Sequence, residues 1–126
     1  MSITLTVRDE SVGGEPTRER TLELPVERIS ARDLIRGRVY QEVQDHNRDQ
    51  NGTYRGLVRP EAREVALNGA RPIDWKRQFD RAIEAFEANQ ILLLIDDRQV
   101  ESLDEEVTLR AGSVATFLRL SLLVGG

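Results

Sequence analysis

The chain has no cysteine among its 126 residues. It can therefore form no disulfide, no thiolate metal site and no thioester on one of its own side chains, and enzymes with a cysteine nucleophile are excluded. Lysine is almost absent too, because Lys76 is the one lysine among the 18 Lys and Arg residues. We attribute the preference for arginine to codon bias in a GC-rich genome.

Long hydrophobic runs and an excess of positive charge are also missing. The net charge is −4 and the isoelectric point is near 5.1, which argues against nucleic acid or an anionic membrane as the main partner, because both need a concentrated basic surface. The apolar run Ile91–Ile95 is far too short to span a bilayer. Residues 1–5 lack the basic and apolar regions of a secretory signal. The sequence predicts a cytoplasmic protein.

Catalytic and metal-binding constellations are scarce. His46 is the one histidine, so no base–nucleophile pair and no histidine metal cluster can be built around it. Residues 47–52 place oxygen ligands on alternate positions, as a calcium loop does, but Val58 stands where the bidentate Glu is required. Adjacent acids in turns, such as Asp96 and Asp97, are usually solvated surface. We predict no catalytic residue, no metal and no cofactor, and thus a protein that is not itself an enzyme.

The N-terminal residues predict a β-hairpin. A chain of this length suits one domain, residues 1–126, with its own core. Residues 2–7 alternate polar and apolar side chains, as a half-buried strand does, and residues 21–24 resume that alternation. Between them, Val12–Pro16 holds two glycines and a proline, which favour a turn.

Two helices are expected. Ser30 and Asp33 have the spacing of a capping box, which predicts a first helix from about Ala31 to Asp45, followed by a polar loop over residues 46–52. Asp74 is placed to cap a second helix. Its apolar residues share one face and are expected in the core rather than in a ligand site: Trp75, Phe79, Ala82, Ile83 and Phe86.

The C-terminal third predicts short strands joined by turns. Ile91–Ile95 is a continuous apolar strand, followed by a turn at Asp96 and Asp97. The last strand is expected from Val114 to about Val124. Further short segments are expected at Gln99–Glu101, at Val107 and Leu109, and in the region between the helices at Leu57–Val58 and Val65–Leu67, with turns at Asn68–Gly69 and Ala111–Ser113.

This order of elements, ending in Gly125 and Gly126, resembles ubiquitin and its relatives. The closest stretches are Gln90–Glu101 and Leu118–Gly126: an apolar third strand, a turn into a Gln-apolar-acidic strand, and a final apolar strand that runs into Gly-Gly. The similarity covers residues 1–50 in pattern and residues 90–126 in pattern and partly in residue type. The resemblance implies an α+β fold, a β-grasp mixed sheet with a helix across it, plus a helical insertion at about 53–89 and a flexible tail at about 122–126.

The resemblance also implies a function as a protein modifier. Gly126 would be adenylated by an activating enzyme that consumes ATP, and then transferred to a conjugating enzyme and a target protein. The absence of a Cβ at both glycines suits passage through a narrow enzyme channel. The residues recognised by the activating enzyme would form the tail: Leu122, Leu123, Val124, Gly125 and Gly126. Because three of these residues are apolar where ubiquitin is basic, the cognate enzyme is expected to have an apolar tail groove.

A second implied element is a partner-binding patch on the sheet. By the resemblance, Leu94 falls at its centre on the third strand, and Leu120 or Ser121 falls beside it on the last strand. A slip of one residue exchanges surface and core, so Leu94 as a core residue stays an alternative. The insertion and the arginine-rich composition look more like modifiers of bacterial ubiquitination-like operons, with a role in antiphage defence, which also encode a deconjugating metallopeptidase.

Two other functions fit the sequence. A sulfur-carrier protein has the same fold and adenylation step but ends in a C-terminal thiocarboxylate. A non-covalent β-grasp interaction module would bind a partner through its sheet, and its Gly-Gly end would be irrelevant, since terminal glycines also occur as frayed ends.

Overall fold

The computed structural model describes residues 2–12, 17–49, 57 and 74–120. Within them it contains two α-helices, α1 (Ala31–Asp49) and α3 (Trp75–Glu87). The strands of these described residues are β1 (Ile3–Ser11), β2 (Arg18–Leu24), β3 (Arg28–Ser30), β4 (Ile91–Ile95), β5 (Arg98–Val100), β6 (Glu106–Thr108) and β7 (Val114–Arg119).

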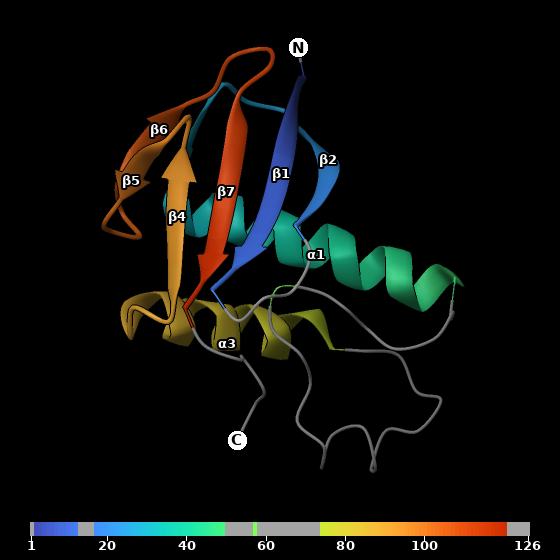
Figure 1. The fold of residues 1–126 in the computed structure, drawn as a ribbon. Helices are drawn as coiled ribbons and strands as arrows, with labels where there is room; N and C mark the ends of the chain where they lie inside the picture. The colour runs from blue at the N-terminus through green and yellow to red at the C-terminus, as the bar shows by residue number, and fades with distance from the viewer. Residues whose placement is uncertain (1, 13–16, 50–56, 58–73, 121–126) are drawn as a thin grey trace.

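The main sheet is mixed and has the strand order β2-β1-β7-β4-β5. β1 and β7 run parallel at its centre, although they are the first and last strands of the chain, and every other pair is antiparallel. Figure 1 shows α1 lying across one face of this sheet and α3 crossing at one end of the strands. The expected α+β, β-grasp-like mixed sheet with a helix across it and a helical insertion is confirmed.

Helix α1 begins where the sequence predicts and ends later. The Ser30 hydroxyl accepts the backbone N–H of Asp33 at 3.1 Å, which caps the first turn as expected. The predicted end at Asp45 is wrong, because the helix continues to Asp49. Side-chain bonds one turn apart support this extension: Asp45 accepts from Gln41 at 2.9 Å and from Arg48 at 3.2 Å. Residues 47–49 are therefore helical rather than part of a polar loop.

Helix α3 matches its prediction. Asp74 is the N-cap, and its carboxylate accepts the backbone N–H of Lys76 at 3.0 Å. Ala82 and Phe86 are buried in the core. The other three apolar residues of the expected face, Trp75, Phe79 and Ile83, are partly buried and pack against that core.

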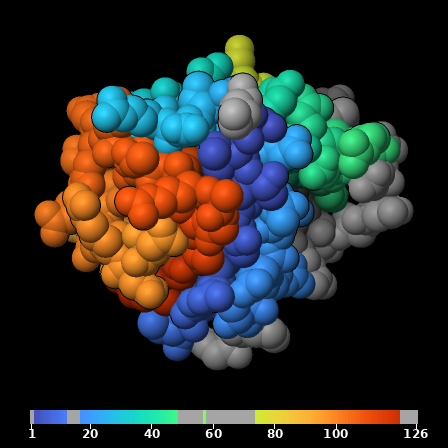
Figure 2. Space-filling view, turned by 90° about the horizontal axis from the view of Figure 1, so that it is seen from above, coloured from blue at the N-terminus to red at the C-terminus, as the bar shows by residue number. Residues whose placement is uncertain are grey.

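A second, two-stranded sheet of β3 and β6 was not foreseen. The two strands pair antiparallel, with Ile29 opposite Val107. Figure 2 shows this end of the molecule, where the segment after β2 (light blue and cyan) lies against the segment around β6 (orange). The short segments expected at Gln99–Glu101 and at Val107 overlap β5 and β6, whereas β3 is too short for its periodicity to be recognised and only its long-range pairing defines it.

The turns predicted at Asp96–Asp97 and Ala111–Ser113 are confirmed, and the last strand is shorter than predicted. The turn predicted over Val12–Pro16 lies mostly outside the described residues. Asp96 and Asp97 both have positive φ, 49° and 71°, and Gly112 turns the chain with φ 87°. β7 ends at Arg119, well before Val124. Leu57 is buried in the core but lies in no strand, while the other strands and the turn expected over residues 58–69 lie outside the described residues. No helix in the described ranges is long and apolar enough to cross a membrane.

Candidate functional site

Strand β4, on which the expected partner surface is centred, presents alternate residues to opposite sides of the sheet. Ile91, Leu93 and Ile95 are buried, whereas Leu92 and Leu94 are only half-buried. Successive residues of a strand point to opposite faces, so the buried set faces the helices and the leucines at 92 and 94 face away from them. Leu94 therefore lies on the outer face of the sheet and not in the core, which was the alternative prediction for this residue.

The last strand extends this surface laterally. In the β4–β7 ladder, Leu92 lies opposite Leu118 and Leu94 lies opposite Thr116. Both β7 residues are half-buried, and they alternate with the fully buried Phe117. We call Leu92, Leu94, Thr116 and Leu118 the outer sheet face. Three leucines and a threonine on adjacent strands make an apolar surface of the kind that docks a partner.

Charged residues of β1 border the outer sheet face. Arg8 lies beside Thr116 and Glu10 beside Leu118 in the parallel β1–β7 ladder. The Arg8 guanidinium also bonds the Glu19 carboxylate of β2 at 3.0 Å. An apolar centre with a polar and charged border is the usual anatomy of a protein–protein contact.

Leu120 marks the point where the described chain ends. Its side chain is 38% exposed, and its backbone N–H donates to the Gln90 carbonyl at 2.9 Å, which holds it beside the start of β4. The structure thus places Leu120 next to the end of the outer sheet face that carries Leu118. Ser121, Leu122, Leu123, Val124, Gly125 and Gly126, all named as site residues from sequence, lie outside the described residues.

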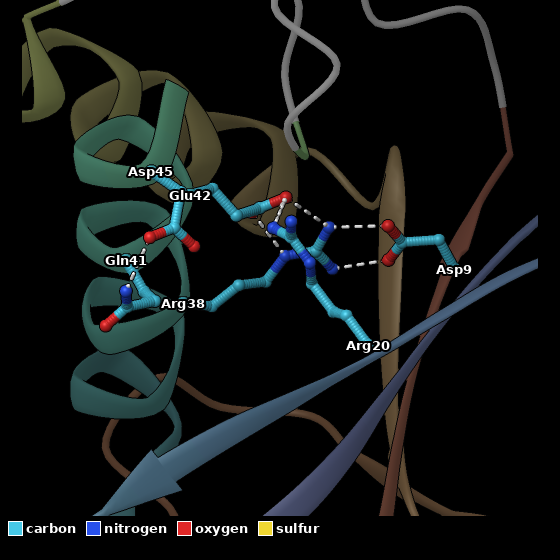
Figure 3. Close-up of polar contacts among 6 residues, drawn as sticks. All are labelled: Asp9, Arg20, Arg38, Gln41, Glu42 and Asp45. Carbon is cyan, nitrogen blue, oxygen red and sulfur yellow. Dashed lines mark hydrogen bonds and ion pairs between the residues drawn. The ribbon is translucent and has the colours of Figure 1, made fainter. Parts of the chain in front are cut away.

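A charged cluster on the inner side of the sheet joins α1 to the hairpin (Figure 3). Arg38 of α1 is 1% exposed, and its guanidinium bonds both oxygens of Asp9 on β1, with Nη2 at 2.7 Å from Oδ2. The same guanidinium donates through Nε to Glu42 at 2.7 Å. Glu42 also forms an ion pair with Arg20 of β2, at 2.9 Å. We call these four residues the buried ion cluster.

The buried ion cluster balances its own charges. Burial by itself lowers the pKa of Arg38, but the charges of Glu42 and Asp9 and their hydrogen bonds outweigh it and raise the pKa above its ordinary value. The guanidinium also lies over the Phe117 ring, 4.5 Å from its centroid. Arg38 bonds Asp9 of β1 and packs on Phe117 of β7, and its partner Glu42 bonds Arg20 of β2. Together these contacts hold the inner face of the three strands to α1. The arrangement is a structural anchor.

A groove on the helix side is lined by aromatic residues that sequence reasoning assigned to the core or overlooked. Tyr40 of α1 is 44% exposed and meets the Trp75 ring edge to face, with centroids 5.2 Å apart. Leu24 and Val26 form the wall at the end of β2. Arg36 lies over the Trp75 ring, 5.6 Å from its centroid. Trp75 is thus both part of the core boundary and part of this groove.

The described residues offer little for catalysis. No three His, Cys, Asp or Glu side chains in this part of the chain come together as metal ligands. The outer sheet face offers a partly exposed, mainly apolar surface on β4 and β7. A scan of protein-family models, a search of curated proteins and a search of solved structures found no match to this chain.

Proposed function

We propose that this chain is a ubiquitin-like protein modifier, whose Gly126 carboxylate is activated by one enzyme, passed to a second and joined to a target protein. The observation that carries the proposal is the continuity of the outer sheet face with the last strand. β7 contributes Leu118 to that face, passes through the exposed Leu120 and leads in sequence to an apolar tail with Gly-Gly at its end. Under this proposal a recognition surface on β7 is followed in the sequence, within a few residues, by a transferable carboxyl group.

The chemistry needs little from the modifier itself. The Gly126 carboxylate attacks the α-phosphate of ATP in the activating enzyme, and pyrophosphate leaves. A thiol of the enzyme system then attacks the acyl carbon of the adenylate, so that a thioester forms and AMP leaves. A glycine at the reacting carbonyl leaves the carbon unhindered. The chain has no cysteine of its own, so the thiols must belong to its partners. Under this proposal the chain is a substrate of its enzymes, not an enzyme.

The outer sheet face is assigned to the partners. Leu94 at its centre, with Leu120 and Ser121 toward the tail, would contact the activating and conjugating enzymes, while Leu122–Gly126 enters the activating site. We place this pathway in the bacterial cytoplasm, with a metallopeptidase that removes the modifier from its targets. The fold, the half-buried Leu94 and the exposed Leu120 support this assignment.

Deletion of Gly126 tests the proposal. The chain would be tagged at its N-terminus and expressed in the cell from which the gene comes. The variant lacking Gly126 would be expressed in the same way as a control. We expect higher-mass conjugates of the tagged chain that disappear when Gly126 is deleted. Leu94→Ala is the second variant, because it leaves the tail intact and is expected to reduce conjugation through weaker enzyme binding.

Other outcomes identify the rival functions. A mass change of the free chain equal to the exchange of one oxygen for one sulfur, dependent on Gly126, would identify a sulfur carrier. Partners that co-purify equally well with and without Gly126, in the absence of any covalent adduct, would identify a non-covalent interaction module. Either result would overturn the modifier proposal.

A further inference from the structure

A cleft lies between β5 and β6, which are edge strands of two separate sheets. β5 ends the order of the main sheet, and β6 has β3 as its one strand partner among the described residues. Figure 1 shows β5 and β6 side by side, on the side of the molecule opposite β2. We call the space between them the β5–β6 cleft. Its volume is about 440 Å³, within the range of known ligand sites, and its lining includes the buried apolar residues Ile95, Val100 and Val107.

The free edge of β5 faces this cleft. Ile95 and Arg98 flank a two-residue turn in which both residues have positive φ, so this pair is joined by hydrogen bonds. Bonded and non-bonded pairs alternate in an antiparallel ladder, so the backbone N–H and C=O of Gln99 point away from β4. The next N–H on that edge belongs to Glu101 and donates to the carboxylate of Glu105, just before β6, at 3.4 Å. The edge is therefore directed toward β6.

β6 presents a free edge to the same cleft. The Glu105 carbonyl accepts the N–H of the first residue of α1 at 2.9 Å, and the Leu109 N–H donates to the residue before β3 at 2.7 Å. Because backbone groups alternate in direction along a strand, those of Glu106 and Thr108 point away from β3. Among the described residues no other strand pairs with this edge. Unpaired N–H and C=O groups on both sides of a cleft are complementary to one extended chain.

The charges around the β5–β6 cleft leave one group for a ligand. Arg98 pairs with Glu105 at 3.5 Å, and Glu106 pairs with an arginine of β3 at 3.8 Å. The Asp96 carboxylate accepts a serine hydroxyl at 3.1 Å and a backbone N–H at 2.9 Å. Arg110 also lines the cleft and is exposed, and within the described part of the chain its guanidinium has no ion pair. A carboxylate is the complement of such a guanidinium.

We propose that the β5–β6 cleft docks an extended, acidic segment of a partner protein, which adds a strand between the two sheets and places a carboxylate at Arg110. Backbone bonds to β5 and β6 hold the segment, and its alternate side chains lie toward Val100 and Val107. The cleft is lined by none of the residues of the outer sheet face. The inference goes beyond the proposed function, because it does not depend on Gly126.

Titration of the full chain with a defined peptide tests the inference. The probe is a synthetic peptide that alternates threonine and valine and ends in glutamate, capped at both ends so that the glutamate side chain is its one charge. The readout is the NMR spectrum of the backbone N–H groups of the isotope-labelled chain. We expect saturable shifts at Gln99, Glu106 and Thr108 and none at Leu94 of the outer sheet face. The variant lacking Gly126 should bind the peptide equally well.

Modified peptides test the backbone bonds. An inserted strand directs alternate N–H groups to β5 and to β6, so methylation of either alternate set of peptide nitrogens removes the donors to one edge and leaves the side chains unchanged. Each methylated peptide should bind at least about ten-fold more weakly, because edge groups are left unpaired. A loss with one set alone would mean addition to a single edge and would overturn the insertion between the two sheets.

Arg110→Gln tests the charge. The glutamate peptide should bind this variant about two- to five-fold more weakly, as expected for an exposed ion pair, whereas a peptide with glutamine in that place should bind both proteins equally. Arg18→Gln is the matched control, because Arg18 is an exposed arginine on β2, at the opposite edge of the main sheet. It should leave binding unchanged. The N–H spectra of the two free variants check that the fold is intact.

Three other results would also overturn the inference. The first is the absence of any saturable shift at millimolar concentrations of the glutamate peptide. The second is a set of shifts confined to the outer sheet face, which would place the peptide on the other docking surface. The third is an Arg110→Gln variant that binds the glutamate peptide as tightly as the unchanged chain does.

Discussion

The two faces of the central sheet use the same strands for opposite purposes. On β4, Leu93 is fully buried against the helices, whereas its neighbour Leu94 is half-exposed on the other side. On β7, Phe117 and Leu118 differ in the same way. The inner face also takes in Arg38, whose charge is compensated by Asp9 of β1 and by Glu42 of its own helix. On the outer face, the charged residues Arg8 and Glu10 of β1 lie at the border of the apolar residues.

This difference shows that residue type alone does not define the role of a position. A leucine on the inner face stabilises the fold by being removed from water, and an arginine there is tolerated because carboxylates and a ring surround it. A leucine on the outer face keeps part of its surface in contact with water, so its removal should cost the fold less. Substitutions on the two faces should accordingly differ in what they damage.

Removal of the buried guanidinium should have the largest effect. Arg38→Ala leaves the buried Glu42 and the partly buried Asp9 without their shared cation, which we expect to lower the free energy of unfolding by about 3–5 kcal/mol. Urea denaturation followed by circular dichroism measures it. Arg20→Ala is the matched control: its side chain is 44% exposed, so the loss should stay below about 1 kcal/mol. Equal midpoints for the two variants would contradict the role of Arg38 as anchor.

Two neighbouring leucines provide the sharpest comparison of the faces. Leu93→Ala opens a cavity in the core and should cost about 2–5 kcal/mol of unfolding free energy. Leu94→Ala removes the same atoms from a half-exposed position and should cost well under half as much. Both are measured by the same denaturation experiment. If Leu94→Ala proved as destabilising as Leu93→Ala, the outer sheet face would be serving the fold rather than a partner.

The smallest effect is expected for a charge on the outer sheet face. Leu118→Lys places an ammonium group beside Glu10 of β1, and the pair can offset part of the lost apolar contact, so stability should change by no more than about 1 kcal/mol. Leu118→Glu sets like charges side by side and should be the less stable of the two. Thermal unfolding at low ionic strength, repeated at high salt, compares them. A Leu118→Glu variant as stable as Leu118→Lys would show that this border charge does not act on the face.

Elements with local signals were predictable. The Asp74 cap and the apolar face behind it identified α3 with nearly correct bounds, and the alternation of residues 2–7 identified β1. The last turn of α1 was missed because residues 46–49 are polar and read as a loop, although Arg48 bonds back to Asp45 within the helix. The i,i+4 spacing of Arg38 and Glu42 was a visible signal for a helix pair that sequence reasoning did not use.

The candidate site was only partly predictable. Leu94 was named from its place in the strand, but which face it occupies could not be decided, because a shift of one residue reverses the faces. The groove between Tyr40 and Trp75 had no signal at all, since its walls come from β2, α1 and α3. Such sites are formed by residues that are far apart in the sequence, so a local sequence pattern does not reveal them.

The sequence by itself determined the class of fold, the hairpin, the starts of both helices, the apolar strand before Asp96 and the singularity of Lys76 as an amine. Only the tertiary structure decided that β1 and β7 lie side by side, that β3 pairs with β6, and that Asp9 meets Arg38. The physical reason is that helix caps and alternation are written within a few consecutive residues. Strand neighbours and buried ion pairs, in contrast, depend on segments that come together only when the whole core is packed.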